Sequence, residues 1–313
     1  MIARMVFGGR LSAKMKLLGQ WGEMVKFSHS VFALPFALMA AFLAARAAFL
    51  AGDASHRYPA AGQVLLIVAC MVTGRSVAMT FNRLVDAALD ARNPRTAGRA
   101  LPAGRMARIH VVCFLVAAAA AFTACCAGFW WRDGNVVPLA LSLPVLAYLC
   151  FYSYTKRFTR WSHFVLGSAI ALSPPAAWLA IHPASIGWPA LVLMAAVTLW
   201  IAGFDIIYAC QDIDSDRAEG LFSLPAGMGA GTALWIARAA HAGTVGLLVL
   251  LVPVADLGWL YGTGVGAVAI LLLVENALVR ADDLSRVNLA FFTVNGIIGV
   301  LLGVLTIADC LVG

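Results

Sequence analysis

Long apolar runs dominate this sequence. Nine of them, each about 20 residues long and mixed in Leu, Val, Ala, Phe and Gly, follow one another along the chain. A helix of about 20 apolar residues crosses a bilayer, whereas a membrane strand has about ten residues of alternating polarity. The sequence therefore predicts an all-α, polytopic membrane bundle of about nine transmembrane helices. The predicted spans are 27–50, 62–80, 107–128, 136–155, 164–182, 188–210, 232–254, 256–279 and 288–311.

Composition supports a membrane protein. Hydrophobic residues make up 62% of the 313 residues and charged ones only 12%, which is too much apolar surface for a soluble core. The net charge of +7 sits in short segments between the apolar runs. These segments predict orientation in a lipid bilayer and no nucleic-acid partner. No linker or low-complexity segment divides the chain, so residues 1–313 are expected to form a single membrane-embedded domain.

The distribution of basic residues predicts the topology. Residues 1–26 are basic, with apolar residues at helical spacing, and are expected to form an amphipathic helix on the cytoplasmic surface. This segment and the even-numbered loops together hold 17 of the 22 Lys and Arg residues. By the positive-inside rule the N-terminus is cytoplasmic, and the site described next opens to the cytoplasmic side of a bacterial inner membrane.

Two polar stretches interrupt the apolar pattern. Residues 82–90 read NRLVDAALD, and residues 208–216 read YACQDIDSD. Each has polar side chains at i, i+4 and i+8, which share one helix face, and the helix of the first is expected to continue to Asn93-Pro94. Corresponding positions lie 126 residues apart and on the same predicted membrane side, so we interpret the stretches as facing halves of one site. The spaced residues are Asn82, Asp86 and Asp90 in the first stretch and Tyr208, Asp212 and Asp216 in the second.

Four aspartates at the mouth of a helical bundle predict a Mg²⁺ site. Carboxylate oxygens suit Mg²⁺ better than softer metals, and Mg²⁺ commonly shares its coordination with substrate phosphates. An incomplete carboxylate set therefore predicts a diphosphate substrate. Polar and basic side chains on the same predicted side can hold and neutralise a diphosphate. They are Asn93, Arg95 and Arg99 in NPRTAGR, and Lys156 and Arg157 in YTKRF.

Two further charged residues fall within predicted spans. Arg75 lies seven residues before Asn82, and Asp205 lies seven before Asp212, so each shares the helix face of its motif. Charge inside a membrane is costly and by default marks a functional site. Arg75 is expected to pair with an aspartate or with an anionic group on a substrate, and Asp205 is expected to belong to the polar cluster.

A Mg²⁺-bound diphosphate beside an apolar cavity suits ionisation of an allylic diphosphate. The resulting carbocation would attack an electron-rich ring, while metal and basic groups stabilise the leaving diphosphate and the helices exclude water. The ring must then lose a proton. Asp86, Asp212 and the diphosphate itself are all candidates for the base, and the sequence does not decide between them.

Three segments resemble a known family. In chain order they are NRLVDAALDARNPRTAGRALPAG, SYTKRFTRWSHFVLG and DIIYACQDIDSDRAEG. The first and last resemble the two Asp-rich signatures of UbiA-type intramembrane aromatic prenyltransferases, and the middle one resembles that family's loop between the fourth and fifth helices. The resemblance implies a nine-helix bundle and Mg²⁺-dependent transfer of a polyprenyl group to 4-hydroxybenzoate or a related aromatic acid in ubiquinone or menaquinone biosynthesis. The second motif and the last helices look closest to members that act on a naphthoate. One departure is Asp214-Ser215, where the family often has an aromatic residue before the last aspartate.

The resemblance also implies roles for single residues. Asn82, Asp86, Asp90, Asp212 and Asp216 fall on the family's Mg²⁺–diphosphate positions, whereas Tyr208 and Asp205 match motif positions of less defined role. The main alternative is an ion-coupled secondary transporter, because intramembrane aspartates can also bind Na⁺ or protons. Clustering of the carboxylates beside arginines at one membrane face favours the diphosphate site. The six histidines are scattered, and most are interpreted as interfacial or packing residues.

Overall fold

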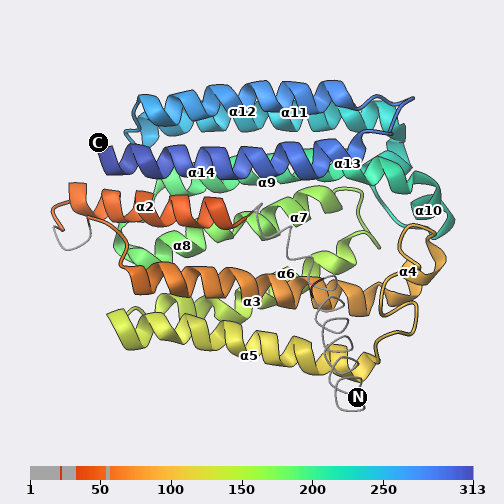
Figure 1. Cartoon of the computed structure of the whole chain (residues 1–313), viewed down its shortest axis with the longest axis horizontal. Coiled ribbons are helices and arrows are strands. Elements are labelled where there is room, and N and C mark those ends of the chain that lie inside the picture. The colour runs from red at the N-terminus through yellow and green to blue at the C-terminus, as the bar shows by residue number, and fades with distance from the viewer. Residues whose placement is uncertain (1–21, 23–32, 54–56, 313) are drawn as a thin grey trace, which may run out of the picture.

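The computed structural model describes residues 22, 33–53 and 57–312 (Figure 1). Within these residues the fold is helical, and the only β-type pairing is an isolated bridge between Arg280 and Asp283. The amphipathic helix expected over 1–26 and the beginning of the first predicted span lie outside the described residues, residue 22 excepted.

The helices follow the predicted apolar runs closely. Their bounds are α2 Leu34–Leu50, α3 Ala61–Val85, α4 Ala87–Arg92, α5 Arg108–Asp133, α6 Val137–Thr155, α7 Ser162–Ala171, α8 Ser173–Ile181, η3 Pro183–Ser185, α9 Trp188–Ala209, η4 Cys210–Asp212, α10 Ile213–Ala218, α11 Leu224–Val254, α12 Trp259–Leu278, α13 Val287–Leu289, η5 Ala290–Val294 and α14 Asn295–Val312. Eight helical spans are long and apolar enough to cross a membrane, and α2 is a shorter apolar helix. The described residues thus confirm the helical membrane bundle that the sequence predicts.

Two spans differ in detail from the prediction. The fifth, predicted as one helix over 164–182, is divided into α7 and α8, because Pro174 and Pro175 cannot donate backbone hydrogen bonds and so favour the start of a new helix. The seventh begins at Leu224 rather than near 232. Its first turn is separated from the rest by Gly229, whose φ of 81° lies in the left-handed region that glycine tolerates.

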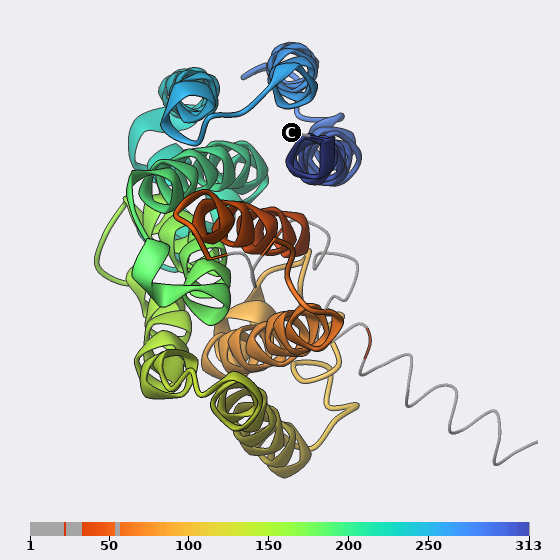
Figure 2. The same cartoon turned by 90° about the vertical axis from the view of Figure 1, so that its left-hand side faces the viewer.

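Helix α9 forms the centre of the bundle. Of the most apolar 18 residues in its span, 67% are buried, compared with 28% for the span of α3. It packs against α7, α8 and α11, and its Trp200 lies fully inside the main hydrophobic core. Seen end-on (Figure 2), α3 and α5 lie on one side of the molecule and α11 and α12 on the other, with α2 between them. The second polar motif therefore begins on the helix whose span has the largest buried share.

A glycine permits the close approach of α7 to α9. A Cβ on Gly167 would collide with the backbone oxygen of Thr198 and would lie 3.3 Å from the backbone nitrogen of Ala202. Backbone atoms on a packed helix cannot rotate away as a side chain can, so this contact requires glycine. It fixes α7 against the part of α9 that leads into the second motif.

Candidate active site

Both polar motifs lie at the same end of the bundle, where α3 leads into α4 and α9 leads into α10 (Figure 1). The backbone bends at the first aspartate of each motif: Asp86 has φ −94° and ψ 5°, and Asp212 has φ −109° and ψ 8°. Each bend is followed by a six-residue helix. The prediction of an uninterrupted helix up to Asn93-Pro94 is therefore wrong at Asp86, where Arg157, which follows α6, binds the carboxylate.

In the first motif, both carboxylates are paired. Asp86 accepts hydrogen bonds from Asn82 Nδ2 at 2.8 Å and from Arg157 Nη2 at 2.9 Å. Both oxygens of Asp90 accept from Nη1 of Arg99, at 2.6 and 2.7 Å. Asn82 thus orients the first carboxylate, while arginines neutralise both carboxylates.

The second motif shows the same pattern. Arg95 binds Asp212 with two hydrogen bonds, Nε to Oδ1 at 2.9 Å and Nη2 to Oδ2 at 2.6 Å. Asn93 Nδ2 donates to the same Oδ1 at 3.2 Å. Lys156 Nζ lies 3.1 Å from Oδ1 of Asp216. Each of the four motif aspartates is therefore paired with a positively charged lysine or arginine side chain.

Tyr208 does not repeat the role of Asn82, although the two occupy equivalent positions. Its hydroxyl accepts a hydrogen bond from Arg95 Nη1 at 3.0 Å, and the guanidinium carbon lies 5.2 Å from the centre of the tyrosine ring. Asn82 orients an aspartate, whereas Tyr208 holds the arginine that binds an aspartate. This contact fixes Arg95 at the mouth of the site.

The basic residues connect the two motifs. Lys156 and Arg157 are consecutive residues at the end of α6, yet the first binds Asp216 and the second binds Asp86. Arg95 follows α4 and reaches across to the second motif. The separated halves of the sequence are thereby joined into one polar site, as the 126-residue offset predicts.

Burial and pairing change the proton affinities here. Burial is the main reason that the pKa of Asp86 is raised, and the charge of Arg157 opposes it. Burial disfavours the charged form of Lys156, but the charge of Asp216 and its hydrogen bond outweigh burial and raise the lysine pKa. The pKa of Arg95 is raised for the same reason, with Asp212 as its partner. Both bases remain fully charged at neutral pH.

A cavity of about 460 Å³ extends from this polar cluster into the bundle. Every residue predicted for the site lines it: Arg75, Asn82, Asp86, Asp90, Asn93, Arg95, Arg99, Lys156, Arg157, Asp205, Tyr208, Asp212 and Asp216. Away from the aspartates the walls are apolar and include Phe122 and Phe129 of α5 and Leu141 of α6. A polar mouth and an apolar interior suit a substrate with a charged head and a long hydrocarbon tail.

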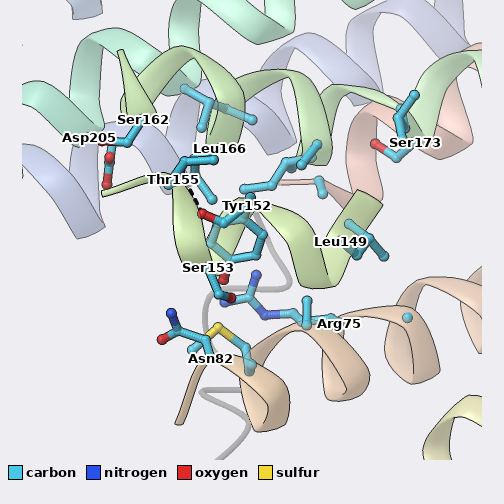
Figure 3. A pocket seen from close by; sticks show the side chains of 18 of the residues that line it. Arg75, Asn82, Leu149, Tyr152, Ser153, Thr155, Ser162, Leu166, Ser173 and Asp205 are labelled. Carbon is cyan, nitrogen blue, oxygen red and sulfur yellow. Dashed lines mark hydrogen bonds between the residues drawn. The ribbon is translucent and has the colours of Figure 1, made fainter. Parts of the chain in front are cut away.

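Arg75 of α3 and Tyr152 of α6 lie next to each other in the cavity, near Asn82 (Figure 3). The Nε of Arg75 is buried and has no hydrogen-bond partner among the described residues. A buried guanidinium nitrogen without an acceptor is costly, so this position suits an anionic or strongly accepting group on a ligand. Tyr152 lies four residues before Lys156, on the same helix face, and this spacing is the signal by which the sequence could have identified it.

The structure also places one histidine at the site. The sequence does not single out His163, but its Nδ1 lies 2.7 Å from Oδ2 of Asp205, and both residues line the cavity. The sequence gives no signal for this contact, because the two residues are on different helices, 42 positions apart. Only the packing of α7 on α9 brings them together.

The donor set fits Mg²⁺ shared with a phosphorylated ligand. In the described part of the chain, no three His, Cys, Asp or Glu side chains are close enough to enclose a metal ion by themselves. The carboxylates stand instead in two pairs, and Oδ2 of Asp216 is buried without a partner there. Hard oxygen ligands in an incomplete set leave room for phosphate oxygens and water, the usual coordination of protein-bound Mg²⁺.

Comparison with known proteins agrees with this geometry. The sequence model of the UbiA prenyltransferase family matches residues 33–297. The chain belongs to the UbiA prenyltransferase family. It is therefore an enzyme, a prenyltransferase, and the transporter alternative has no support from this membership.

Two curated relatives illustrate the range of this UbiA family. The chain is 28% identical to the 4-hydroxybenzoate octaprenyltransferase of Chromohalobacter salexigens, covering 76% of this chain and 78% of the relative. It is also 28% identical to the protoheme IX farnesyltransferase of Gloeobacter violaceus, covering 68% of this chain and 70% of that one. Both relatives are prenyltransferases, but their names indicate different acceptors.

Solved structures of UbiA homologues share the fold. The apo structure of a UbiA homologue from Aeropyrum pernix K1 superposes with a TM-score of 0.74 and 28% identity, covering 91% of this chain and 97% of that one. A UbiA homologue from Archaeoglobus fulgidus, solved with GPP and Mg²⁺, has a TM-score of 0.70 at 17% identity and covers 93% and 99%. The latter likeness concerns the fold alone.

Proposed function

We propose that this enzyme transfers a polyprenyl group from an allylic polyprenyl diphosphate to an aromatic acid, 4-hydroxybenzoate or a hydroxynaphthoate, in ubiquinone or menaquinone biosynthesis. The observation that supports the proposal most strongly is the set of four aspartates, each paired with a base, at the mouth of an apolar cavity. A diphosphate head would lie at that mouth and the prenyl tail in the cavity.

The aspartates and Asn82 would hold Mg²⁺, and Arg95, Arg99, Lys156 and Arg157 would bind the diphosphate. When bound, Mg²⁺ supplies positive charge that stabilises the leaving diphosphate. The four bases already converge on the aspartates, so they stand within reach of any phosphate that joins the carboxylates there. Preorganised positive charge favours cleavage of the carbon–oxygen bond, because negative charge develops on the departing oxygen.

The apolar part of the cavity would protect the carbocation. Phe122 and Phe129 contribute to walls without ionised groups, so few nucleophiles compete with the aromatic acceptor. Relatives of this chain are named octaprenyltransferase and farnesyltransferase, so their names include both a long and a short tail. The proposal specifies a polyprenyl donor without fixing its length.

Arg75 supports an acid as the acceptor. Arg75 lines the cavity beside Tyr152 and has a buried, unpartnered Nε, and an aromatic ring bound there would lie between the tail and the diphosphate (Figure 3). A carboxylate matches the planar guanidinium and would satisfy its buried nitrogen. The active site would open to the cytoplasmic side of a bacterial inner membrane, as the distribution of Lys and Arg indicates.

The decisive experiment is a transfer assay. Membranes that contain the enzyme would be incubated with a labelled polyprenyl diphosphate, Mg²⁺, and either 4-hydroxybenzoate or a dihydroxynaphthoate. We expect a labelled, prenylated acid from one of these acceptors and none in excess EDTA. Absence of product with both acids would contradict the acceptor class. Membranes with the Asp86→Ala variant serve as the matched control for background activity.

A further inference from the structure

Asp205 differs from the four motif aspartates in its partner. Each motif aspartate is paired with an arginine or a lysine, whereas Asp205 is paired with His163, Nδ1 to Oδ2 at 2.7 Å. Within the described residues no salt bridge joins Asp205 to Lys or Arg. A positively charged arginine or lysine stabilises the ionised form of a carboxylate and so weakens it as a base. A neutral imidazole donates one hydrogen bond and leaves the negative charge on the carboxylate.

The surroundings of His163 determine which nitrogen carries the proton. Its Nε2 accepts a hydrogen bond from the backbone N–H of Leu224 at 3.4 Å. A nitrogen that accepts cannot also carry a proton, so the proton of the neutral ring is on Nδ1 and is donated to Asp205. This is the arrangement in which a histidine orients a carboxylate and leaves its charge in place.

Asp205 also faces the space that a substrate would occupy. Its side chain is 23% exposed, and it lines the cavity, whereas the side chain of His163 is only 3% exposed. Asp205 lies on α9, seven residues before Asp212, and is therefore near the diphosphate end of the cavity, where its charge contributes to raising the pKa of Lys156. Figure 3 shows Asp205 on the same side of the cavity as Ser162, with Tyr152 and Arg75 beyond. An aromatic ring bound near Arg75 and Tyr152 would therefore lie close to this carboxylate.

We propose that Asp205 is the base that removes the ring proton and that His163 is its positioning residue. The carbon–oxygen bond of the allylic diphosphate breaks, and the diphosphate leaves with the electron pair. A ring carbon then bonds to the allylic carbon, and its hydrogen passes as a proton to Asp205, which restores the aromatic system. This inference rests on the proposed function, because it requires an aromatic acceptor.

The test compares variants with a ring-deuterated acceptor. General-base catalysis contributes about 10²–10⁴-fold, so Asp205→Asn is expected to lower kcat by about 100-fold or more and His163→Leu by about tenfold or more. Because deprotonation becomes slow in both variants, the deuterium isotope effect on kcat should rise above its wild-type value. The KM values of both substrates should change by less than about threefold. His163→Gln, whose amide can donate to Asp205, should recover most of the rate.

His241 provides a matched control. It is equally buried, is bound to Asn276 and lies outside the cavity, so His241→Gln reports the effect of replacing a buried histidine as such. It should leave the isotope effect unchanged. If His163→Leu fails to insert into membranes, the kcat and isotope effect of Asp205→Asn and His163→Gln still test the proposal.

The possible outcomes separate this inference from the proposed function. If the wild-type enzyme prenylates no aromatic acid, the proposed function itself fails. If the wild-type enzyme is active but Asp205→Asn keeps its kcat, or loses kcat without a larger isotope effect, Asp205 is not the base and only this inference is overturned.

Discussion

Arg95 binds Asp212 through both oxygens, at 2.9 and 2.6 Å, although 117 residues separate them. The arginine belongs to the segment after the first motif and the aspartate to the second motif, so this ion pair closes the site across the two halves of the sequence. The side chain of Asp212 is only 10% exposed, and both of its oxygens already accept hydrogen bonds from Arg95. A metal ion that binds Asp212 must therefore displace Arg95, and the freed guanidinium is then available to a phosphate.

We first predict that Mg²⁺ and diphosphate bind cooperatively. Mg²⁺ alone must compete with the arginines that bind Asp86, Asp90 and Asp212, whereas diphosphate offers those arginines new partners at the same time. The dissociation constant of the metal should fall at least about tenfold when a non-reactive prenyl diphosphate analogue is present, a coupling of about 1.4 kcal/mol. Calorimetric titration of the purified enzyme with and without the analogue measures this. By linkage, Mg²⁺ must improve the affinity of the analogue by the same factor.

The variant Arg95→Gln provides the control for this coupling. It removes the competing charge from Asp212, so Mg²⁺ alone should bind more tightly than in the wild-type enzyme, while the diphosphate analogue binds more weakly. Equal Mg²⁺ affinity in the wild-type enzyme and Arg95→Gln would show that Arg95 does not compete with the metal.

A second prediction concerns the aspartates. Asp86→Ala and Asp212→Ala should each reduce turnover by at least about 100-fold, because each removes a carboxylate proposed to hold the metal that stabilises the leaving group. Both proteins should still insert into membranes. Asp282→Ala, in an exposed loop between α12 and α13, serves as the matched control and should retain full activity. A wild-type rate in either motif variant would remove that aspartate from the proposed metal site.

A third prediction tests how the acceptor is recognised. Replacing Arg75 by Leu should raise the KM of the aromatic acid by at least about tenfold, since a buried charge partner of the carboxylate is lost. The KM of the prenyl diphosphate should change little. The methyl ester of the same acid, which lacks the anionic charge, should be used about equally by both enzymes. If the KM of the diphosphate rises instead, Arg75 acts on the donor.

Most of the site could be predicted from the sequence because its residues lie on local patterns. Asn82 and Asp86 are placed one helical turn apart by their spacing, and the 126-residue offset predicts that the second motif faces the first. Charge within apolar sequence singles out Arg75 and Asp205. For these residues, spacing along the chain and charge within apolar sequence carry enough information to predict that they lie together.

The rest depends on tertiary packing. The contact between His163 and Asp205 exists only because Gly167 lets α7 approach α9, and no local pattern reports the distance between two helices. The bend at Asp86 was missed for the same reason, since Arg157, which holds the carboxylate, comes from the end of α6. The sequence also does not predict which lysine or arginine pairs with which aspartate, because these pairs depend on how the helices pack.

The last prediction concerns this helix contact. Gly167→Val should push α7 away from α9, because its Cβ would collide with the backbone oxygen of Thr198. Overpacking of this kind costs about 1–3 kcal/mol, so the Tm of the detergent-solubilised protein should fall. Gly246→Ala in α11 is the matched control, since no atom lies within 4 Å of its added Cβ, and alanine favours the helix. Fluorescence-monitored thermal unfolding measures both variants, and an equal Tm for Gly167→Val and the wild-type protein would show that the two helices can separate at no cost.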